Sequence, residues 1–164
     1  MNQLTPEIIQ KKLKTGLLGR NIYCFNQITS TNDFAKKLLE QNAPEGTLII
    51  AEYQTQGRGR LGRSWLAPPG KALLFSLILK PETPMKKIGL VSLLASIAVA
   101  EAMESLVNVK PALKWPNDIL LNNKKICGIL LETVTNNFSD LCSFIILGVG
   151  INLTQQVEDF PKDI

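Results

Sequence analysis

The run GRGRLGRSW occupies residues 57–65 and lies between two apolar segments, 47–53 and 72–79. Its glycines let the backbone approach a ligand closely, and arginine offers a planar fork of donors that holds a phosphate or carboxylate at two points. Three of the chain's four arginines fall in this run, while the rest of the chain carries fourteen lysines. From Gln54 to Lys71 there are four basic residues and no acid, which equals the formal net charge of +4. The run therefore indicates an anion-binding loop.

The residues that follow this run decide how the loop is built. A dinucleotide-binding glycine motif or a Walker A loop must open a helix whose N-terminus holds the phosphate. Pro68, Pro69 and Gly70 come soon after the run, and a helix of useful length does not survive two prolines. A protein-kinase glycine loop lies between strands, but that fold needs a much longer chain and a catalytic His-Arg-Asp run. We therefore expect a strand–loop–strand unit, with strands at 47–53 and 72–79.

Three interpretations of the loop remain open from its composition. It could bind a small phosphate-bearing ligand, it could bind RNA, or it could be a solvated basic loop. The adjacent Trp65 and a sequence pI of about 9.0 favour RNA. Against RNA, the loop is short, is not repeated and lies inside a folded domain.

The composition of the chain bounds its class. With 164 residues, 45% of them hydrophobic, it forms one domain with a buried core. It contains no histidine, which excludes Ser-His-Asp and Cys-His nucleophiles and histidine metal sites. Cys24, Cys127 and Cys142 are scattered, which favours reduced thiols over a zinc site. No signal peptide begins the chain and the apolar stretch 88–100 is too short to span a bilayer, so we expect a cytoplasmic protein that does not bind membranes.

Apolar periodicity and capping signals predict an intermixed order of helices and strands. We expect strands at 22–28, 47–53, 72–79, 112–115, 119–121, 125–134 and 141–148, and helices beginning at Thr5-Pro6, at Ser30 and at Met85. The third helix runs to about Asn108 and is expected to carry Leu90, Leu93, Leu94 and Ile97 on one face. This order predicts an α+β domain with a mixed β-sheet flanked by helices.

A second dense signal is the run KWPND at residues 114–118. Asn117 and Asp118 form a tight turn that presents an amide and a carboxylate together. Such a pair can contact a nucleoside or hold Mg²⁺ through oxygen, but it can equally be a β-turn with solvated tips. Lys125 opens the next apolar strand, where a lysine is usually solvated, and the following Gly128 would let a ligand lie against the strand.

Neutral hydrogen-bonding groups accompany the basic loop. Ser30, Thr31 and Asn32 stand at the expected start of a helix, where an N-cap explains one of the three. Gln54 lies just before the loop and adds an amide. Together with the arginines, these groups suit a ligand that is amide-like at one end and anionic at the other.

In this order and spacing, GRGRLGRSW (57–65), KWPND (114–118) and KICG (125–128) resemble the catalytic domain of biotin protein ligase, which attaches biotin to carboxylase carrier domains. STN (30–32) and GVGIN (148–152) match as well, so the resemblance covers nearly the whole chain. Lipoate ligases share the fold but lack this arginine spacing and the Trp-Pro-Asn-Asp run. The resemblance implies that the biotin carboxylate attacks Mg-ATP to give biotinyl-5′-adenylate, and that a carrier lysine then takes the acyl group.

The resemblance also implies a role for each matching residue. The biotin-binding set is Ser30, Thr31, Asn32, Gln54, Arg58, Gly59, Arg60 and Lys125. The set for ATP and the adenylate is Arg63, Trp65, Asn117, Asp118 and Asn152, with Asp118 also placing Mg²⁺. Lys125 and Arg60 are the implied catalytic residues.

The resemblance implies biotin and ATP as substrates, Mg²⁺, and a biotin carrier domain of a biotin-dependent carboxylase as partner; a homodimer is compatible with it. The 21 residues before Ile22 are too few for the N-terminal winged helix of some members, so we expect no DNA binding. The family continues past Asn152, so we expect residues 1–164 to form a catalytic domain that is incomplete at its C-terminus, without the C-terminal β-barrel domain. The alternatives are a basic RNA- or ligand-binding module without turnover and a lipoate ligase-like enzyme of the same fold.

Overall fold

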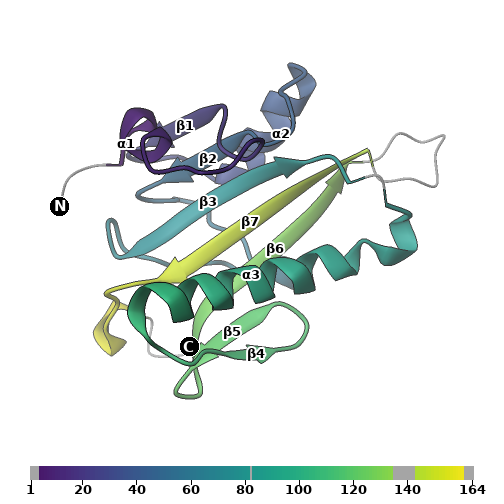
Figure 1. The fold of residues 1–164 in the computed structure, drawn as a ribbon. Coiled ribbons are helices and arrows are strands. Elements are labelled where there is room, and N and C mark those ends of the chain that lie inside the picture. Colours follow the sequence, from purple (N-terminus) through teal and green to yellow (C-terminus); the bar gives the residue numbers. More distant parts are fainter. Residues whose placement is uncertain (1–3, 82, 135–142, 161–164) are drawn as a thin grey trace.

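A seven-stranded mixed sheet forms the centre of the computed structural model, which describes residues 4–81, 83–134 and 143–160 (Figure 1). In spatial order the strands are β1 (Ile22–Phe25), β2 (Leu48–Ala51), β3 (Ala72–Leu79), β7 (Phe144–Asn152), β6 (Lys124–Val134), β5 (Asp118–Leu121) and β4 (Ala112–Lys114). β1 and β2 run parallel, and every other neighbouring pair is antiparallel. The helices are α1 (Pro6–Gln10), α2 (Thr31–Glu40) and α3 (Gly89–Val107), with short 3-10 turns at Arg60–Gly62, Met85–Lys87 and Val157–Asp159. The expected α+β fold with a mixed sheet is confirmed.

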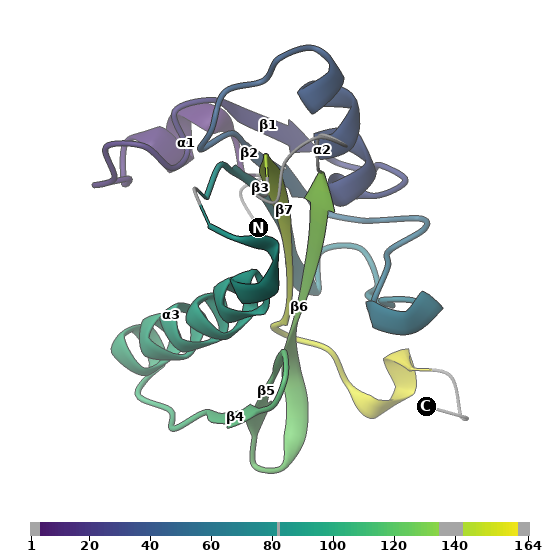
Figure 2. The same ribbon diagram turned by 90° about the vertical axis from the view of Figure 1, so that its right-hand side faces the viewer.

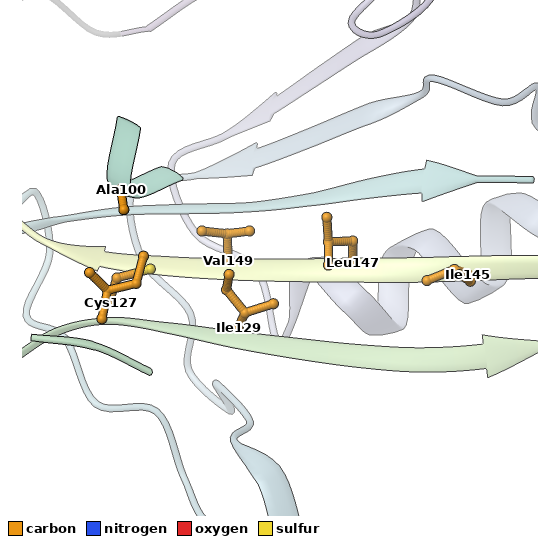
Figure 3. Close-up of a cluster of buried hydrophobic side chains, with 7 residues drawn as sticks. Ala100, Cys127, Ile129, Ile145, Leu147 and Val149 are labelled. Atoms are coloured by element: carbon orange, nitrogen blue, oxygen red, sulfur yellow. The ribbon is translucent and has the colours of Figure 1, made fainter. Parts of the chain in front are cut away.

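Helices α2 and α3 cover opposite faces of this sheet (Figure 2). Side chains alternate between the two faces along a strand, so neighbours on β7 enter different cores. Ile145, Leu147 and Val149 pack with Ala100 of α3 and with β6 (Figure 3), whereas Ile146 packs with the residues of α2. The central strands are therefore apolar on both sides, and polar residues within them stand out.

The packing face of α3 differs from the expected one. Leu90, Leu94 and Ile97 are exposed, while the residues that pack on the sheet are Ile88, Val91, Ala95, Val99, Ala100 and Met103. The segment Met85–Val107 has a mean hydropathy of 1.8, which makes it long and apolar enough to cross a membrane by length and composition alone, and its apolar residues are spread around the helix. Because the helix has no polar face, apolar periodicity could not select the side that meets the sheet.

Local signals at the ends of elements behave as expected. The Thr5 and Ser30 side chains cap α1 and α2 by accepting hydrogen bonds from the backbone N–H groups of Ile8 and Asp33. Asn122 and Asn123 both take positive φ in the turn between β5 and β6. The bounds of two strands differ most from the expected ones. β7, expected at 141–148, begins at Phe144 and reaches Asn152, with residues 141 and 142 outside the described part, and β1, expected at 22–28, ends at Phe25.

Candidate functional site

A cleft of about 470 Å³ is lined by the loop of residues 57–65. This loop lies on the face of the sheet opposite α3 (Figure 2). The walls of the cleft come from six segments of the sequence: the start of α2, the loop with the preceding Gln54, β3, residues 114–118, β6 and β7. With the exception of Asn152, all the predicted site residues line it: Ser30, Thr31, Asn32, Gln54, Arg58, Gly59, Arg60, Arg63, Trp65, Asn117, Asp118 and Lys125. The fold therefore gathers the separate motifs into one site.

One end of the cleft carries buried neutral groups with fixed orientations. The Gln54 Oε1 atom accepts from the Thr31 backbone N–H at 2.7 Å and from the Thr31 hydroxyl at 3.0 Å. Because a backbone N–H can only donate, the Gln54 oxygen must face Thr31 and its amide nitrogen must point elsewhere. Ser30, Thr31 and Asn32 are all buried at the start of α2. This end can therefore read the donors and acceptors of an amide-like group.

Two residues of this end were not predicted from the sequence. Ser76 is buried in the middle of β3, and its hydroxyl oxygen lies 2.5 Å from Asn32 Oδ1 and 2.7 Å from Thr31 Oγ1. Glu132 on β6 accepts a hydrogen bond from Asn32 Nδ2 at 2.7 Å. Ser76 is the lone polar residue of the apolar run ALLFSLIL, and Glu132 is the charged residue of the run ICGILLETV. That interruption is the signal that could have found them.

Two arginines of the loop, Arg58 and Arg60, have different surroundings. Arg58 Nη2 lies 2.7 Å from Asp33 Oδ1 and 2.8 Å from Glu132 Oε2, so two carboxylates balance its charge. Arg60 Nη1 instead donates to the neutral Asn117 Oδ1 at 2.9 Å. Two carboxylates therefore hold Arg58 in place, whereas the charge of Arg60 at the wall of the cleft is not balanced by its neutral partner.

The loop also closes on itself and on the turn at residues 114–118. The Gly59 N–H donates to the Arg63 carbonyl at 2.7 Å, and the Trp65 N–H donates to the Gly57 carbonyl at 2.9 Å. Asn117 Nδ2 donates to the Ile129 carbonyl at 2.8 Å, which ties the turn to β6 and fixes the oxygen that Arg60 meets. The peptide bond before Pro116 is cis.

Lys125 and Trp65 form the opposite end of the cleft. Lys125 Nζ lies 2.8 Å from Asp118 Oδ1 and 5.4 Å from the centre of the Trp65 ring. The ring rests on Gly128 and Gly150, which are paired across β6 and β7; a methyl group added to them would come within 2.7 Å and 2.5 Å of ring atoms. Glycine is thus required at both positions to seat the indole.

A second pocket of about 1150 Å³ lies on the other side of Lys125 and Trp65. Both residues line the two pockets, and Asn152 and Gln155 line the second one. In the described part of the chain, Trp65 Nε1, Asn152 Oδ1 and Gln155 Oε1 are buried without a hydrogen-bond partner. Buried polar atoms are normally paired, so these three favour a polar ligand in the second pocket.

The charges along the site are unequal. Besides Arg58, the first cleft is lined by Arg60, Arg63, Lys114 and Lys125, with Asp118 as its acid. The arrangement can hold an amide-like group at one end, negative charge near Lys125 and a second polar ligand beyond Trp65. Lys125 stands where the two ligands would meet.

Comparison with known proteins shows where this arrangement has counterparts. The model of the "Biotin/lipoate A/B protein ligase family" matches residues 24–152. The chain is 41% identical over 162 residues to the bifunctional ligase/repressor BirA of Bacillus spizizenii, covering 99% of this chain and 49% of the relative. It is 34% identical over 172 residues to the biotin–[acetyl-CoA-carboxylase] ligase of Mycobacterium tuberculosis, covering 99% and 62%.

A solved structure supports the same grouping. The biotin protein ligase of Aquifex aeolicus in complex with biotin and ATP matches with a TM-score of 0.69 and 34% identity. The match covers 88% of this chain and 56% of that one. The chain thus spans about half to three fifths of the length of the proteins it matches.

Proposed function

Because the chain belongs to the biotin/lipoate A/B protein ligase family, we propose that it joins biotin to a protein lysine, using ATP and passing through biotinyl-5′-adenylate. The observation that carries this proposal is the position of Lys125, which lines both pockets. The first pocket has an end with amide and hydroxyl groups, and the second has polar atoms without hydrogen-bond partners. A biotin molecule has a ureido group at one end and a carboxylate at the other. These two groups match the neutral and the basic ends of the first cleft.

In the first step, a carboxylate oxygen of biotin attacks the α-phosphorus of ATP, a P–O bond forms, and pyrophosphate leaves with the electrons of the bond that breaks. Both reactants are anions, so catalysis depends on positioning and on neutralising charge. Lys125 lines both pockets, and Arg60 and Arg63 line the first. We assign Lys125 and Arg60 to the carboxylate and the α-phosphate, and Arg63 to the remaining phosphates.

In the second step, the amine of an acceptor lysine attacks the acyl carbon, an amide bond forms, AMP leaves, and the amine loses a proton. We assign Asn117, Asp118 and Asn152 to the adenylate, with the Trp65 ring between the two pockets. The acceptor is a biotin carrier domain of a biotin-dependent carboxylase, in keeping with the name of the M. tuberculosis relative.

Magnesium fits the site as a companion of the nucleotide. No group of three or more His, Cys, Asp or Glu residues gathers in the described part of the chain, so a cage made of protein alone is not present there. Mg²⁺ at nucleotide sites takes one or two protein carboxylates and completes its shell with phosphates and water. Asp118, which pairs with Lys125, and Asn152 Oδ1, which has no hydrogen-bond partner, are the oxygens that would hold it. When bound, the ion neutralises phosphate charge.

Biotin is favoured over lipoate by the neutral end of the cleft. The oriented amides of Gln54 and Asn32, with Ser30 and Thr31, suit a ureido group that both donates and accepts hydrogen bonds. The dithiolane ring of lipoate offers no N–H or C=O and would make no hydrogen bond with this end of the cleft, whereas each hydrogen bond that biotin makes there contributes roughly 0.5–1.5 kcal/mol. Biotin–Gln54 and biotin–Asn32 contacts therefore provide the discrimination.

Incubation of the protein with biotin and Mg-ATP, followed by mass spectrometry, tests the proposal. Biotinyl-adenylate and pyrophosphate are the expected products, and lipoate in place of biotin should give none. Salt-sensitive RNA binding without any response to biotin would contradict the proposal and favour a basic binding module. A cytoplasmic location, a homodimer and the absence of DNA binding stay predictions.

A further inference from the structure

Among the described residues, Glu132 is the acid whose carboxylate contacts both Asn32 at the neutral end of the cleft and Arg58 of the loop. It lies on β6, and its carboxylate receives three donors from two other segments. Asn32 Nδ2 of α2 donates to Oε2 at 2.7 Å, and Lys36 Nζ, one turn further along α2, donates to Oε1 at 2.8 Å. Arg58 Nη2 of the loop donates to Oε2 at 2.8 Å.

The first consequence concerns the orientation of Asn32. An ionised carboxylate only accepts hydrogen bonds, so the amide nitrogen of Asn32 must be the atom that faces Glu132. The Asn32 oxygen is then directed to Ser76 and to the backbone of Gly148, where an added methyl group would lie 2.4 Å from it. Asn32 lines the cleft, so this orientation presents an acceptor to a ligand N–H.

The second consequence concerns Arg58. Its guanidinium reaches Glu132 on the sheet and Asp33 on α2, which attaches the first half of the loop to the body of the domain. The loop tip is open, with Leu61 89% exposed. Loss of the Glu132 charge would leave Asp33 as the remaining carboxylate of the anchor.

We propose that Glu132 is a positioning residue for the ligase reaction, which orients Asn32 toward the ureido N–H of biotin and anchors the loop through Arg58. This inference rests on the proposed function. Glu132 does not touch the reacting atoms, because the contacts described for it end at Asn32, Lys36 and Arg58. Its removal should therefore weaken biotin binding and loosen the loop, with little effect on the chemical step.

The test compares Glu132→Gln with the wild type in two measurements. In adenylate formation, the KM for biotin should rise about tenfold or more while kcat changes less than about threefold, as expected when a charged hydrogen-bonding partner is removed from a binding contact. In limited digestion by trypsin without ligand, cleavage after Arg60 and Arg63 should speed up severalfold, while cleavage at sites outside the loop changes much less. Biotin should protect the loop strongly in the wild type and weakly in the variant.

Lys36→Met is the matched control, because it removes a cation from the same carboxylate without touching Asn32 or the loop. It should leave the biotin KM and the digestion rate near wild type. Arg58→Gln provides a second route: it should speed loop cleavage as Glu132→Gln does, and the double variant should add little, because both remove the same contact.

Wild-type values of the biotin KM or of the loop digestion rate in Glu132→Gln would overturn the inference. Equal effects of Glu132→Gln and Lys36→Met would overturn it too, since they would reduce Glu132 to a surface charge. If the wild-type chain makes no biotinyl-adenylate, the proposed function fails. The digestion of the loop still decides whether Glu132 anchors Arg58.

Discussion

The two ends of the cleft use charge in opposite ways. At the Glu132 end, Arg58 and Lys36 face Asp33 and Glu132, two cations against two anions, and the ligand meets neutral amides and hydroxyls. At the Lys125 end, Arg60, Arg63 and Lys125 face a single acid, Asp118. Arginine therefore stabilises the structure at the Glu132 end, where carboxylates balance its charge. At the Lys125 end its charge is not balanced, and it attracts an anion.

Replacement of Lys125 should have the largest effect, because it removes the cation at the point where the two pockets meet. Lys125→Ala should lower the rate of biotinyl-adenylate formation about 100-fold or more, in the range seen when one electrostatic stabiliser is deleted. Quenched-flow assays with mass spectrometry measure this rate. Lys86→Ala, an exposed lysine before α3, is the charge-matched control and should stay near wild type. A wild-type rate in Lys125→Ala would reject the assignment.

Two glycines on β7 allow the two ends of the cleft to be tested separately. A change to alanine adds one methyl group, and it does so at one end only. In Gly148→Ala the new methyl group would lie 2.4 Å from Asn32 Oδ1, and in Gly150→Ala it would lie 2.5 Å from the Trp65 ring. Overpacking of this kind costs about 1–3 kcal/mol, so each change should weaken the binding of one ligand roughly tenfold or more. Calorimetry should show Gly148→Ala impairing biotin binding and Gly150→Ala impairing ATP binding. The reverse pattern, or equal losses of both ligands, would refute the division.

Arg60→Gly tests the loop at the boundary between the ends. It removes a cation and the hydrogen bond to Asn117 Oδ1, so the adenylate should dissociate about tenfold faster, in line with the loss of a charged hydrogen bond. Release of labelled adenylate from a preformed complex gives this rate. Arg60→Lys, which keeps the charge without the planar fork, should release the adenylate at a rate between those of the wild type and Arg60→Gly. Unchanged release in Arg60→Gly would show that Arg60 does not hold the adenylate.

The smallest expected effect is on stability in acid. Burial raises the pKa of Glu132, but hydrogen bonds from Lys36 and Asn32 and the charges of Arg58 and Lys36 outweigh it and hold that pKa below its usual value of 4.5. A depressed pKa in the folded state contributes stability that is present above pH 4.5 and is lost as the pH falls through the lower, folded-state value. Denaturant titrations from pH 6 to pH 2 should therefore show a smaller acid loss in Glu132→Gln than in the wild type. Parallel curves would contradict the carboxylate network.

The sequence predicted the elements whose signals are local. The caps at Thr5 and Ser30, the Asn122–Asn123 turn and the strands on both sides of the loop depend on neighbouring residues, and the structure has them. The predicted packing face of α3 was wrong, because the apolar residues of this helix do not gather on one side.

The pairing of charged side chains at the site could not be predicted from neighbouring residues in the sequence. Arg58 meets Glu132 across 74 residues of sequence, and Asn32 meets it across 100. No pattern within either segment indicates such a pairing, so the three arginines looked equivalent. Their different roles come from the order of strands in the sheet, which brings β6 and the start of α2 together beneath the loop.

The most direct test of the two-ended cleft is a binding cycle with biotin and biotinamide, whose carboxylate is replaced by a neutral amide. Calorimetry would measure both ligands with the wild type and with Lys125→Ala. The wild type should bind biotin more tightly than biotinamide, and Lys125→Ala should bind the two nearly alike, because the cation that distinguishes them is gone. An equal preference for biotin in both proteins would show that the carboxylate does not lie at Lys125, and the account would fail.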